Sequence, residues 1–367
     1  MRKFLTVIAL LACLSAHSQT RWIDPFAEGA QTHGQGWSEL RGGFSRLPDK
    51  AHGVVRQPVW DLSRQSAGLS LVFRSNSKCI TVRYTVAGGH SMFHMPSTGV
   101  SGVDMYATGK DGKLRWCACD FTPSYRDTIT FRYSGLTYYE GNEDYEYRLY
   151  MPLYNTVTWM QIGVDEGADL AFVPVSSQKP VVVYGTSITQ GACASRTGMA
   201  WTNIVGRELG LPVVNLGFSG NGKLEPELFD LLAEIDASMY IIDCMPNMSP
   251  DSPIRERVLA GVAKLREAHD CPILLVEHSG HSNFVSNSGR RSFIEINERL
   301  REAYDAVRAA GHKNIYYLTY EQVGFGMEGM VEGVHPTDLG MRRQADAYEK
   351  ALRRILHLRR TGKRTNY

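Results

Sequence analysis

The sequence predicts two domains, an all-β sandwich followed by an α/β domain built on a parallel sheet of five strands. The 367 residues exceed the roughly 250–300 that one hydrophobic core usually holds. Residues 20–178 favour short strands separated by turn residues, whereas apolar runs alternate with amphipathic segments of helical length after residue 178. With 43% hydrophobic and 21% charged residues, the composition is that of an ordinary globular protein.

The first residues have the pattern of a secretory signal. Arg2 and Lys3 precede an apolar run over residues 4–14, and small residues follow. We therefore expect residues 1–18 to be a signal peptide that directs export to the periplasm or the extracellular space. A lipoprotein anchored through Cys13 is the alternative. No later apolar run approaches the roughly 18 residues that a membrane span requires, so no span is expected.

The charge of the expected mature chain argues against a nucleic-acid partner. The sequence contains 40 basic and 38 acidic residues. Removing Arg2 and Lys3 with the signal peptide leaves equal numbers, so the net formal charge is close to zero. Proteins that bind nucleic acid usually carry a marked excess of basic residues.

The first predicted domain spans residues 19–178 and consists of strands, with no helix expected between them. Its candidate strands are short, rich in β-branched and aromatic residues and bounded by turn residues. They are LSLVFRS (69–75), CITVRYTV (79–86), GVDMYATG (102–109), KLRWCACDF (113–121), DTITFRYS (127–134) and EYRLYMPLY (146–154). Strands of this kind at regular spacing are typical of a sandwich or jelly roll.

The second predicted domain spans residues 179–367 and alternates strands with helices. The strand candidates are VVVYG (181–185), LPVVNLG (211–217), MYIIDCM (239–245), PILLVEH (272–278) and NIYYLTY (314–320). The helix candidates cover residues 198–210, 225–235, 253–269, 291–311 and 337–358. Continuous apolar strands that alternate with amphipathic helices predict a parallel sheet covered on both faces.

Small and polar residues follow four of these strands. Ser187 lies in GTSITQG after the first, Gly220 in NLGFSGNG after the second and Asn247 in DCMPN after the third. Glu332 and His335 lie in EGVHPTDLG, between the last strand and the final helix. Ligands of open α/β sheets bind beyond the carboxyl ends of the strands, so we expect these residues to meet at one edge.

These residue types in this order suit acyl transfer. A serine hydroxyl becomes a good nucleophile when an imidazole accepts its proton and a third group orients the imidazole. Ser187, His335 and Glu332 are our candidates for these three catalytic roles. The oxyanion of the tetrahedral intermediate needs hydrogen-bond donors, which the backbone N–H groups of Ser187 and Gly220 and the Asn247 amide can supply.

The blocks GTSITQG, NLGFSGNG, MPNM and EGVHPTDLG resemble, in this order, the four blocks of the SGNH hydrolases, also called GDSL-type esterases and lipases. The resemblance covers about residues 180–358. It implies a flavodoxin-like three-layer α/β/α fold with Ser187 as nucleophile and His335 as base. It also implies that Gly220 and Asn247 contribute to the oxyanion hole.

The first half is similar to the jelly-roll-like β-sandwich that precedes this domain in an exported bacterial subgroup of the family. The GxDLY motif of that subgroup reads GVDMY here, at residues 102–106. Members of the subgroup look like carbohydrate esterases. We therefore expect a secreted serine esterase that removes small acyl groups, acetyl in particular, from an acylated carbohydrate substrate. A lipase or lysophospholipase on the same triad, or a non-catalytic glycan-binding protein, is the alternative.

Two positions depart from the family pattern. Thr186 occupies the position where the first block usually has Asp, and Glu332 occupies the position of the Asp that usually orients the histidine. An orienting acceptor is the physical requirement, so we assign Glu332 to this role. Glu328, Asp338 or a backbone carbonyl are the possible substitutes.

A second polar cluster, EHSGHSN, follows the fourth predicted strand. Its spacing differs from that of zinc proteases, so we predict no metal there. Instead, Glu277 and His278, together with Thr186, are our candidates for substrate binding, and a structural loop is the alternative. The GxSxG turn of the α/β-hydrolases is excluded because Thr189 occupies its second glycine position. The expected chemistry requires no cofactor.

Overall fold

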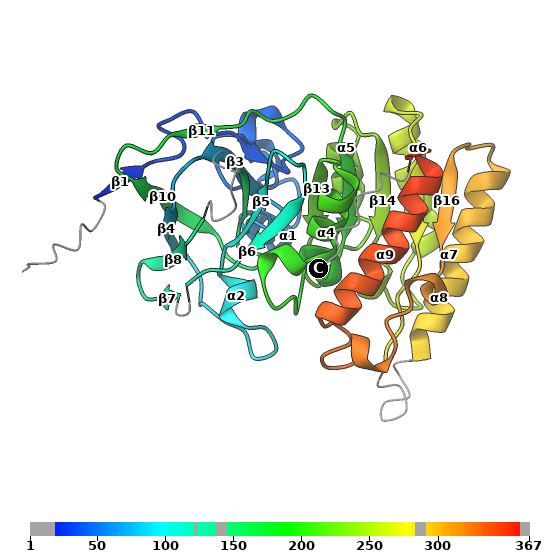
Figure 1. Ribbon diagram of the computed structural model, residues 1–367. Coiled ribbons are helices and arrows are strands. Elements are labelled where there is room, and N and C mark those ends of the chain that lie inside the picture. Colours follow the sequence, from blue (N-terminus) through cyan, green and yellow to red (C-terminus); the bar gives the residue numbers. More distant parts are fainter. Residues whose placement is uncertain (1–18, 121–122, 137–144, 283–290, 360–367) are drawn as a thin grey trace, which may run out of the picture.

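The computed structural model describes residues 19–120, 123–136, 145–282 and 291–359. The predicted signal peptide, with Cys13, lies outside the described residues. Two antiparallel sheets form the first half and one parallel sheet the second (Figure 1). This confirms the predicted fold class, a β-sandwich followed by a three-layer α/β domain.

The two antiparallel sheets enclose a common core. The first has the strand order β1 (Thr20–Ile23), β10 (Val157–Asp165), β4 (Cys79–Val86), β8 (Ile129–Ser134) and β7 (Ser124–Tyr125). The second has the order β11 (Leu170–Phe172), β3 (Ser70–Ser75), β9 (Tyr145–Tyr150), β5 (Asp104–Thr108) and β6 (Leu114–Cys117), and β2 (Thr32–His33) also pairs with β3. Alternate residues of both sheets, such as Phe73 and Val82, point into one hydrophobic cluster.

The parallel sheet has the flavodoxin-like strand order. Its strands in space are β13 (Val213–Gly217), β12 (Val181–Gly185), β14 (Met239–Asp243), β15 (Ile273–Val276) and β16 (Ile315–Leu318). The chain therefore starts in β12, adds β13 on one side and then adds the remaining strands on the other. Ligand sites of such sheets lie at the point where the strand order reverses, which here is the carboxyl end of β12.

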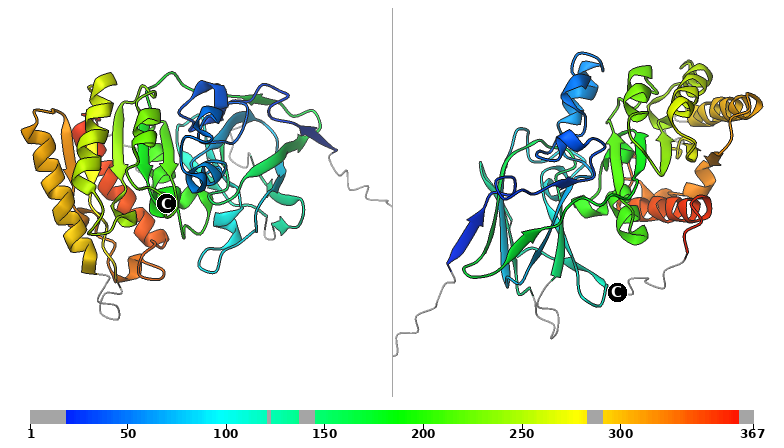
Figure 2. Two further views of the ribbon diagram at one scale, coloured as in Figure 1. Left: turned by 180° about the vertical axis from the view of Figure 1, so that it is seen from behind. Right: turned by 90° about the horizontal axis from the view of Figure 1, so that it is seen from above.

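Helices cover both faces of the parallel sheet (Figures 1 and 2). On one face lie α5 (Pro226–Leu232), α6 (Ile254–Ala268) and α7 (Ser292–Ala309). On the other face lie α4 (Trp201–Leu209), α8 (Tyr320–Val323) and α9 (Asp338–Ile355). Val182 and Tyr184 of β12 face the first set, and Val181 and Val183 face the second. Among the described residues, no helix combines the length and apolar character needed to cross a membrane.

The expectation of no helix in the first half is wrong. That half contains α1 (Gln57–Ser63) and α2 (Ser97–Val100). Val59 of α1 is only 1% exposed because it packs in the same core as Leu228 of α5. Packing against the α/β domain, rather than local sequence periodicity, thus stabilises α1.

Arg46 fastens the first half to the parallel sheet. Its guanidinium, 1% exposed, donates to the carbonyls of Leu62 and Gln65 and also to those of Asn215 and Gly217 at the end of β13. Burial lowers the pKa of Arg46 to about 9, so it remains charged at neutral pH. One side chain therefore joins the segment around α1 to the strand that precedes Gly220.

We expect Arg46→Lys to destabilise the protein because an ammonium group cannot reach the same four carbonyls. Leaving buried acceptors unpaired should lower the free energy of unfolding by about 2 kcal/mol or more, measured by urea denaturation. Arg64→Lys, on a side chain that is 38% exposed, is the matched control and should change it by less than about 0.5 kcal/mol. Equal losses in the two variants would contradict the role given to Arg46.

Candidate active site

The register of the parallel sheet brings three loops to one edge. Gly185, the last residue of β12, pairs with Gly217 of β13 on one side and with Asp243 of β14 on the other. The three strands therefore end at the same level. The segments that follow them, which contain Ser187, Gly220 and Asn247, are consequently neighbours.

Ser187 is the first residue of the short helix α3 (Ser187–Gln190), which begins directly after β12. Its backbone N–H has no partner within the helix because it belongs to the first turn. The helix lies very close to the sheet. A Cβ on Gly217 would approach the backbone nitrogen of Gln190 to 2.3 Å, so only glycine permits this contact.

His335 and Glu332 stand beside Ser187. His335 Nε2 lies 2.8 Å from Ser187 Oγ, and His335 Nδ1 lies 2.5 Å from Glu332 Oε1. A tight turn positions the pair, since Val331 N–H donates to the carbonyl of His335. Glu332 Oε1 also accepts a hydrogen bond from the backbone N–H of His335. Serine, histidine and glutamate thus form one continuous chain of donors and acceptors.

The other acids considered for this position are engaged elsewhere or placed apart. Asp338 accepts hydrogen bonds from the backbone N–H and the hydroxyl of Ser195, at 2.9 and 2.5 Å. Glu328 is exposed, and its carbonyl accepts a hydrogen bond from the Thr337 hydroxyl. Of the three carboxylates, Glu332 is the one in contact with the His335 ring.

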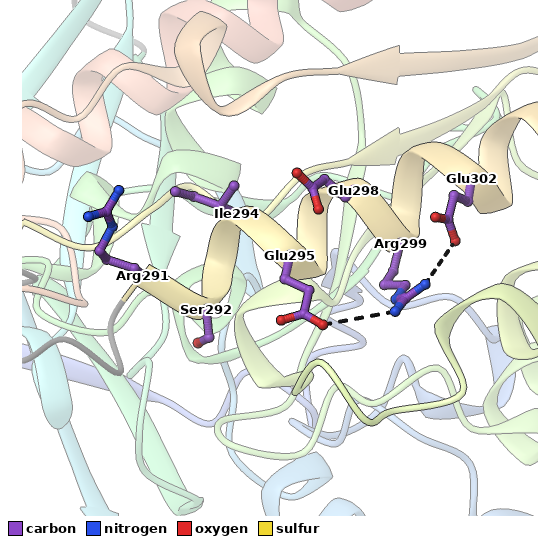
Figure 3. A pocket seen from close by; sticks show the side chains of 7 residues that line it. All are labelled: Arg291, Ser292, Ile294, Glu295, Glu298, Arg299 and Glu302. Carbon is purple, nitrogen blue, oxygen red and sulfur yellow. Dashed lines mark hydrogen bonds and ion pairs between the residues drawn. The ribbon is translucent and has the colours of Figure 1, made fainter.

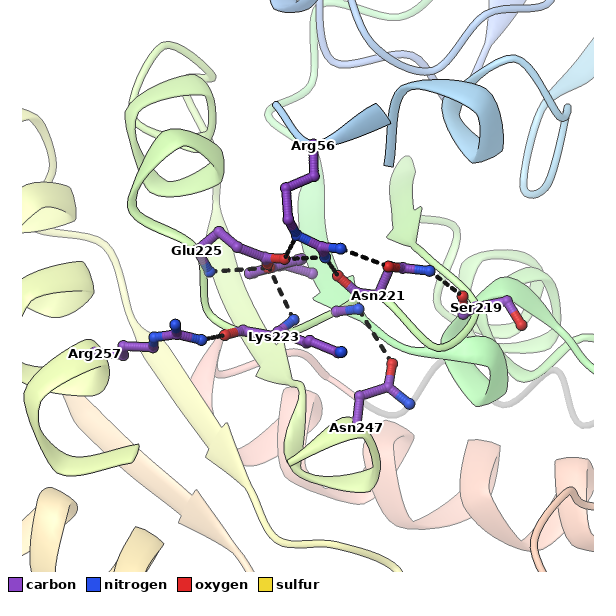
Figure 4. A network of polar contacts seen from close by, with 9 residues as sticks. Arg56, Ser219, Asn221, Lys223, Glu225, Asn247 and Arg257 are labelled. Carbon is purple, nitrogen blue, oxygen red and sulfur yellow. Dashed lines mark hydrogen bonds and ion pairs between the residues drawn. The ribbon is translucent and has the colours of Figure 1, made fainter. Parts of the chain in front are cut away.

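Gly220 lies in the loop that follows β13, and Asn247 lies beside that loop. Gly220 has a φ of +68°, and nothing lies within 4 Å of the position that a Cβ would occupy. Asn247 ends a 3-10 turn after β14, and its Oδ1 accepts the backbone N–H of Gly222 at 3.1 Å. This bond orients the amide and leaves the Asn247 NH₂ group pointing away from Gly222 (Figure 4).

A polar network from both halves of the chain holds this loop in place (Figure 4). Arg56, just before α1, donates to the side chain and the carbonyl of Asn221 and pairs with Glu225. Glu225 also accepts from the hydroxyl of Tyr184 in β12, and Arg257 donates to the Lys223 carbonyl. The loop that carries Gly220 is therefore tied to the first half as well as to its own sheet.

The GVDMY motif fixes the segment that follows α3. Asp104, only 4% exposed, accepts from Arg196 at 2.5 Å and from the backbone N–H of Gly198 at 3.0 Å. Tyr106, the last residue of the motif, contacts the same guanidinium through its hydroxyl at 2.6 Å. Arg196 follows Ser195, which binds Asp338 at the start of α9. The motif thus anchors a segment that follows the nucleophile helix and binds the start of α9.

Further residues surround the His335 ring. The His94 ring, from the first half of the chain, lies edge-on with its centroid 5.4 Å from that of His335. Cys193 lies close by, and burial raises the pKa of its thiol to about 12, so it is neutral at pH 7. One ligand atom each of His94, Cys193 and His335 lies within 4.8 Å of the others. Both nitrogens of His335 are already engaged, so a metal ion would have to displace Ser187 or Glu332.

The three predicted substrate-binding residues make the following contacts. Thr186 is fully buried, and its hydroxyl caps α3 by accepting from the N–H of Ile188. Glu277 accepts from the backbone N–H of Tyr320 in α8, and His278 is held by backbone bonds to Asn297 of α7. Glu277 and His278 are 8% and 2% exposed. Their described contacts lead to α7 and α8 rather than to Ser187, which favours the structural alternative.

A shallow hollow on α7 lies apart from the triad of Ser187, His335 and Glu332. Its lining belongs to one stretch of chain and shows mostly charged side chains (Figure 3). These are Arg291, Ser292, Ile294, Glu295, Glu298, Arg299 and Glu302. Arg299 is paired with Glu295 and Glu302, so the charges largely satisfy one another.

Comparisons with known proteins agree with this architecture. Residues 178–353 match the model of the GDSL-like lipase/acylhydrolase family. Residues 20–170 match the model for the N-terminal region of SGNH hydrolase-type esterases. Among curated proteins, none has a sequence that matches this chain.

Solved structures are similar over nearly the whole chain. A Bacteroides ovatus protein described as a GDSL-like lipase is 31% identical, with 93% of this chain and 99% of that chain covered and a TM-score of 0.84. The salicylyl-acyltransferase SsfX3 from a tetracycline biosynthetic pathway is 21% identical at the same coverage, with a TM-score of 0.72. A family two carbohydrate esterase from Cellvibrio japonicus, also at that coverage, is 12% identical with a TM-score of 0.53. The similarities to SsfX3 and to the Cellvibrio japonicus esterase show a shared fold and nothing further.

A buried carboxyl group lies beneath the nucleophile helix. Asp243, the last residue of β14, accepts from the hydroxyls of Tyr348 in α9 and Thr189 in α3, at 2.8 and 3.3 Å. Burial raises the pKa of Asp243 to about 6, and the two hydrogen bonds offset only part of that effect. This group was not predicted, because no sequence pattern marks an Asp at the end of a strand as buried.

We expect Asp243→Asn to change how stability depends on pH. An unfolded Asp has a pKa of about 3.9, so the folded wild type holds its proton more tightly and loses stability as pH rises from about 4 to 6. Asp243→Asn has no carboxyl group at this position and therefore does not lose this stability as the pH rises. Its free energy of unfolding relative to wild type should therefore rise by about 2 kcal/mol between pH 4.5 and 7.5.

Urea denaturation at several pH values measures this difference. Asp236→Asn, at a carboxylate that is 65% exposed, is the control and should follow the wild-type pH dependence. The prediction would be contradicted if the free energy of unfolding depended on pH in the same way in wild type and in Asp243→Asn.

Proposed function

Because the chain belongs to the GDSL-like lipase/acylhydrolase family of ester hydrolases, we propose that it is a secreted serine esterase that removes small acyl groups, acetyl above all, from carbohydrate. The observation that carries the proposal is the 2.8 Å contact between Ser187 Oγ and His335 Nε2, with Glu332 on the other ring nitrogen. The carboxylate acceptor on Nδ1 favours the tautomer in which Nε2 accepts the serine proton.

In the first step, Ser187 Oγ attacks the ester carbonyl while His335 Nε2 takes its proton. The carbonyl oxygen becomes an oxyanion, and the N–H groups of Ser187 and Gly220 with the Asn247 amide are the proposed donors. The intermediate then collapses, His335 returns the proton to the leaving alcohol, and an acyl-enzyme remains. Glu332 holds the imidazole in place and stabilises its protonated form throughout.

In the second step, water replaces the alcohol. His335 accepts a proton from the water as its oxygen attacks the acyl-enzyme, and the same donors stabilise the second oxyanion. Ser187 regains its proton when the carboxylic acid leaves. The proposed cycle uses side chains and backbone N–H groups of the protein together with water.

The carbohydrate part of the proposal has separate support. The fold is shared with family two carbohydrate esterases from Clostridium thermocellum and Cellvibrio japonicus. The near-zero charge of the predicted mature chain suits a neutral substrate, and the pattern of residues 1–18 suits export, where polysaccharides are found. An acyltransferase also shares the fold, so an alcohol is the alternative to water as the acceptor of the acyl group.

We expect a fluorophosphonate to label wild-type protein stoichiometrically at Ser187, because only an activated serine reacts quickly. Ser187→Ala should show no labelling and no hydrolysis of acetate esters, and His335→Ala should lose nearly all of both. Ser195→Ala, at a nearby serine that binds Asp338 instead, is the control and should keep its labelling at Ser187.

Mass spectrometry of the labelled protein and hydrolysis of p-nitrophenyl acetate provide the two readouts. An unlabelled, well-folded wild type without esterase activity would favour the non-catalytic glycan-binding alternative. Faster turnover of long-chain than of acetyl esters would favour the lipase alternative and reject the acetyl assignment.

We expect Glu332→Gln to reduce kcat strongly, by about 10³–10⁴-fold, because an amide can turn its NH₂ group towards Nδ1 and stabilise the wrong tautomer. Glu328→Gln is the matched control and should keep near-wild-type activity, since that side chain lies apart from the His335 ring. Initial rates of p-nitrophenyl acetate hydrolysis measure the activity of both variants. Near-wild-type activity in Glu332→Gln would mean that another acceptor orients His335.

A further inference from the structure

We propose that Phe93 and His94 form the binding surface for the leaving alcohol of the ester, and that this alcohol is a sugar ring stacked on Phe93. The inference rests on the proposed function and extends it, because it assigns the substrate side of the site to the first half of the chain. Neither residue has a role in the triad or the proposed oxyanion hole.

The chemistry of ester cleavage decides where the alcohol must lie. The leaving oxygen receives its proton from His335 Nε2 and must therefore come within about 3 Å of that atom. The His94 ring is a direct neighbour of the His335 ring, with centroids 5.4 Å apart. The acyl group instead points its carbonyl oxygen towards the donors around Gly220 and Asn247. The proposal therefore places the carbon skeleton of the alcohol next to His94.

Phe93 continues the surface outward from His94. The two rings are stacked with centroids 4.1 Å apart and an angle of 17° between their planes. Phe93 is 95% exposed, which makes it the most exposed large apolar side chain among the described residues. An aromatic ring held flat beside a reacting histidine, with its other face open, offers a surface on which a ligand can stack.

The loop that carries these rings is anchored on both sides. Met92 and Met95 form an isolated antiparallel bridge, and Met95 is buried in the core that also contains Ile188 of the nucleophile helix. On the other side, Asn155 binds the backbone of Gly88 and Gly89. The loop leads directly into α2 (Figure 1). Exposure of Phe93 is therefore a property of a fixed loop.

A neutral sugar ring fits the chemistry of this surface. The axial C–H bonds of a pyranose can point to the negative face of an aromatic ring, while the hydroxyl groups stay at the edge in water. Burial and the neighbouring His335 lower the pKa of His94, so the ring is uncharged at neutral pH. Phe93 and His94 offer no charge to attract a phosphate or carboxylate on the alcohol, and they would therefore favour neutral alcohols.

We test this by comparing three acetate esters that share the acyl group and differ in the alcohol. Acetylated xylo-oligosaccharides carry sugar rings, 2-naphthyl acetate carries a flat aromatic alcohol, and vinyl acetate carries almost nothing beyond the leaving oxygen. We expect Phe93→Ala to lower kcat/KM for the first two by about 3- to 10-fold, chiefly through KM. Vinyl acetate should change by less than about twofold, and Phe93→Trp should retain wild-type values. Release of acetate at constant pH follows all three reactions.

Ile294→Ala, at another exposed apolar side chain but on α7, is the control and should change none of the rates. Equal losses on all three esters would show that Phe93 supports His335 itself, and unchanged rates on all three would show that it binds no alcohol; either result overturns the proposal. If wild type cleaves naphthyl and vinyl acetate but no acetylated sugar, the carbohydrate assignment fails. A selective loss on naphthyl acetate would then still support the alcohol-binding surface.

Discussion

The position of Ser187 depends on how closely α3 approaches the ends of β12 and β13. Gly217 lets the backbone of α3 lie directly on the sheet, and a single methyl group at this position would collide with it. This contact fixes where the helix starts, and the parallel register then sets the distance to the loops after β13 and β14. Backbone packing therefore sets the geometry of the site, and the side chains of His335 and Glu332 complete it.

The first half of the chain is part of this construction. Arg46 binds the carbonyls at the end of β13, Arg56 holds the loop that contains Gly220, and Asp104 holds the segment after α3. The hydroxyl of Tyr154 reaches the carbonyl of Ser187 itself. The first half of the chain, which contacts the end of β13, the loop with Gly220 and the nucleophile helix, is thus a structural support for the α/β domain, in addition to any role in binding substrate.

The sequence was sufficient for the fold class and for the polar residues at the strand ends, because apolar periodicity and short motifs are local patterns, while the flavodoxin-like arrangement was implied by the family resemblance. It was insufficient wherever a contact between distant segments decides the outcome. The helix α1 is stabilised by packing on α5, and Asp243 is buried by α9. Glu277 and His278 follow a strand two places away from β12, and their described hydrogen bonds are with α7 and α8.

Glutamate at position 332 can occupy the place of an aspartate because of the turn that carries it. The extra methylene would carry a carboxylate past Nδ1 on an extended segment, but the turn from Val331 to His335 folds the side chain back. Glu332 Oε1 meets both the ring and the backbone N–H of His335, so two donors from one residue fix its position. The physical requirement is an acceptor held at Nδ1, and a longer side chain satisfies it when the backbone between acid and histidine is correspondingly tight.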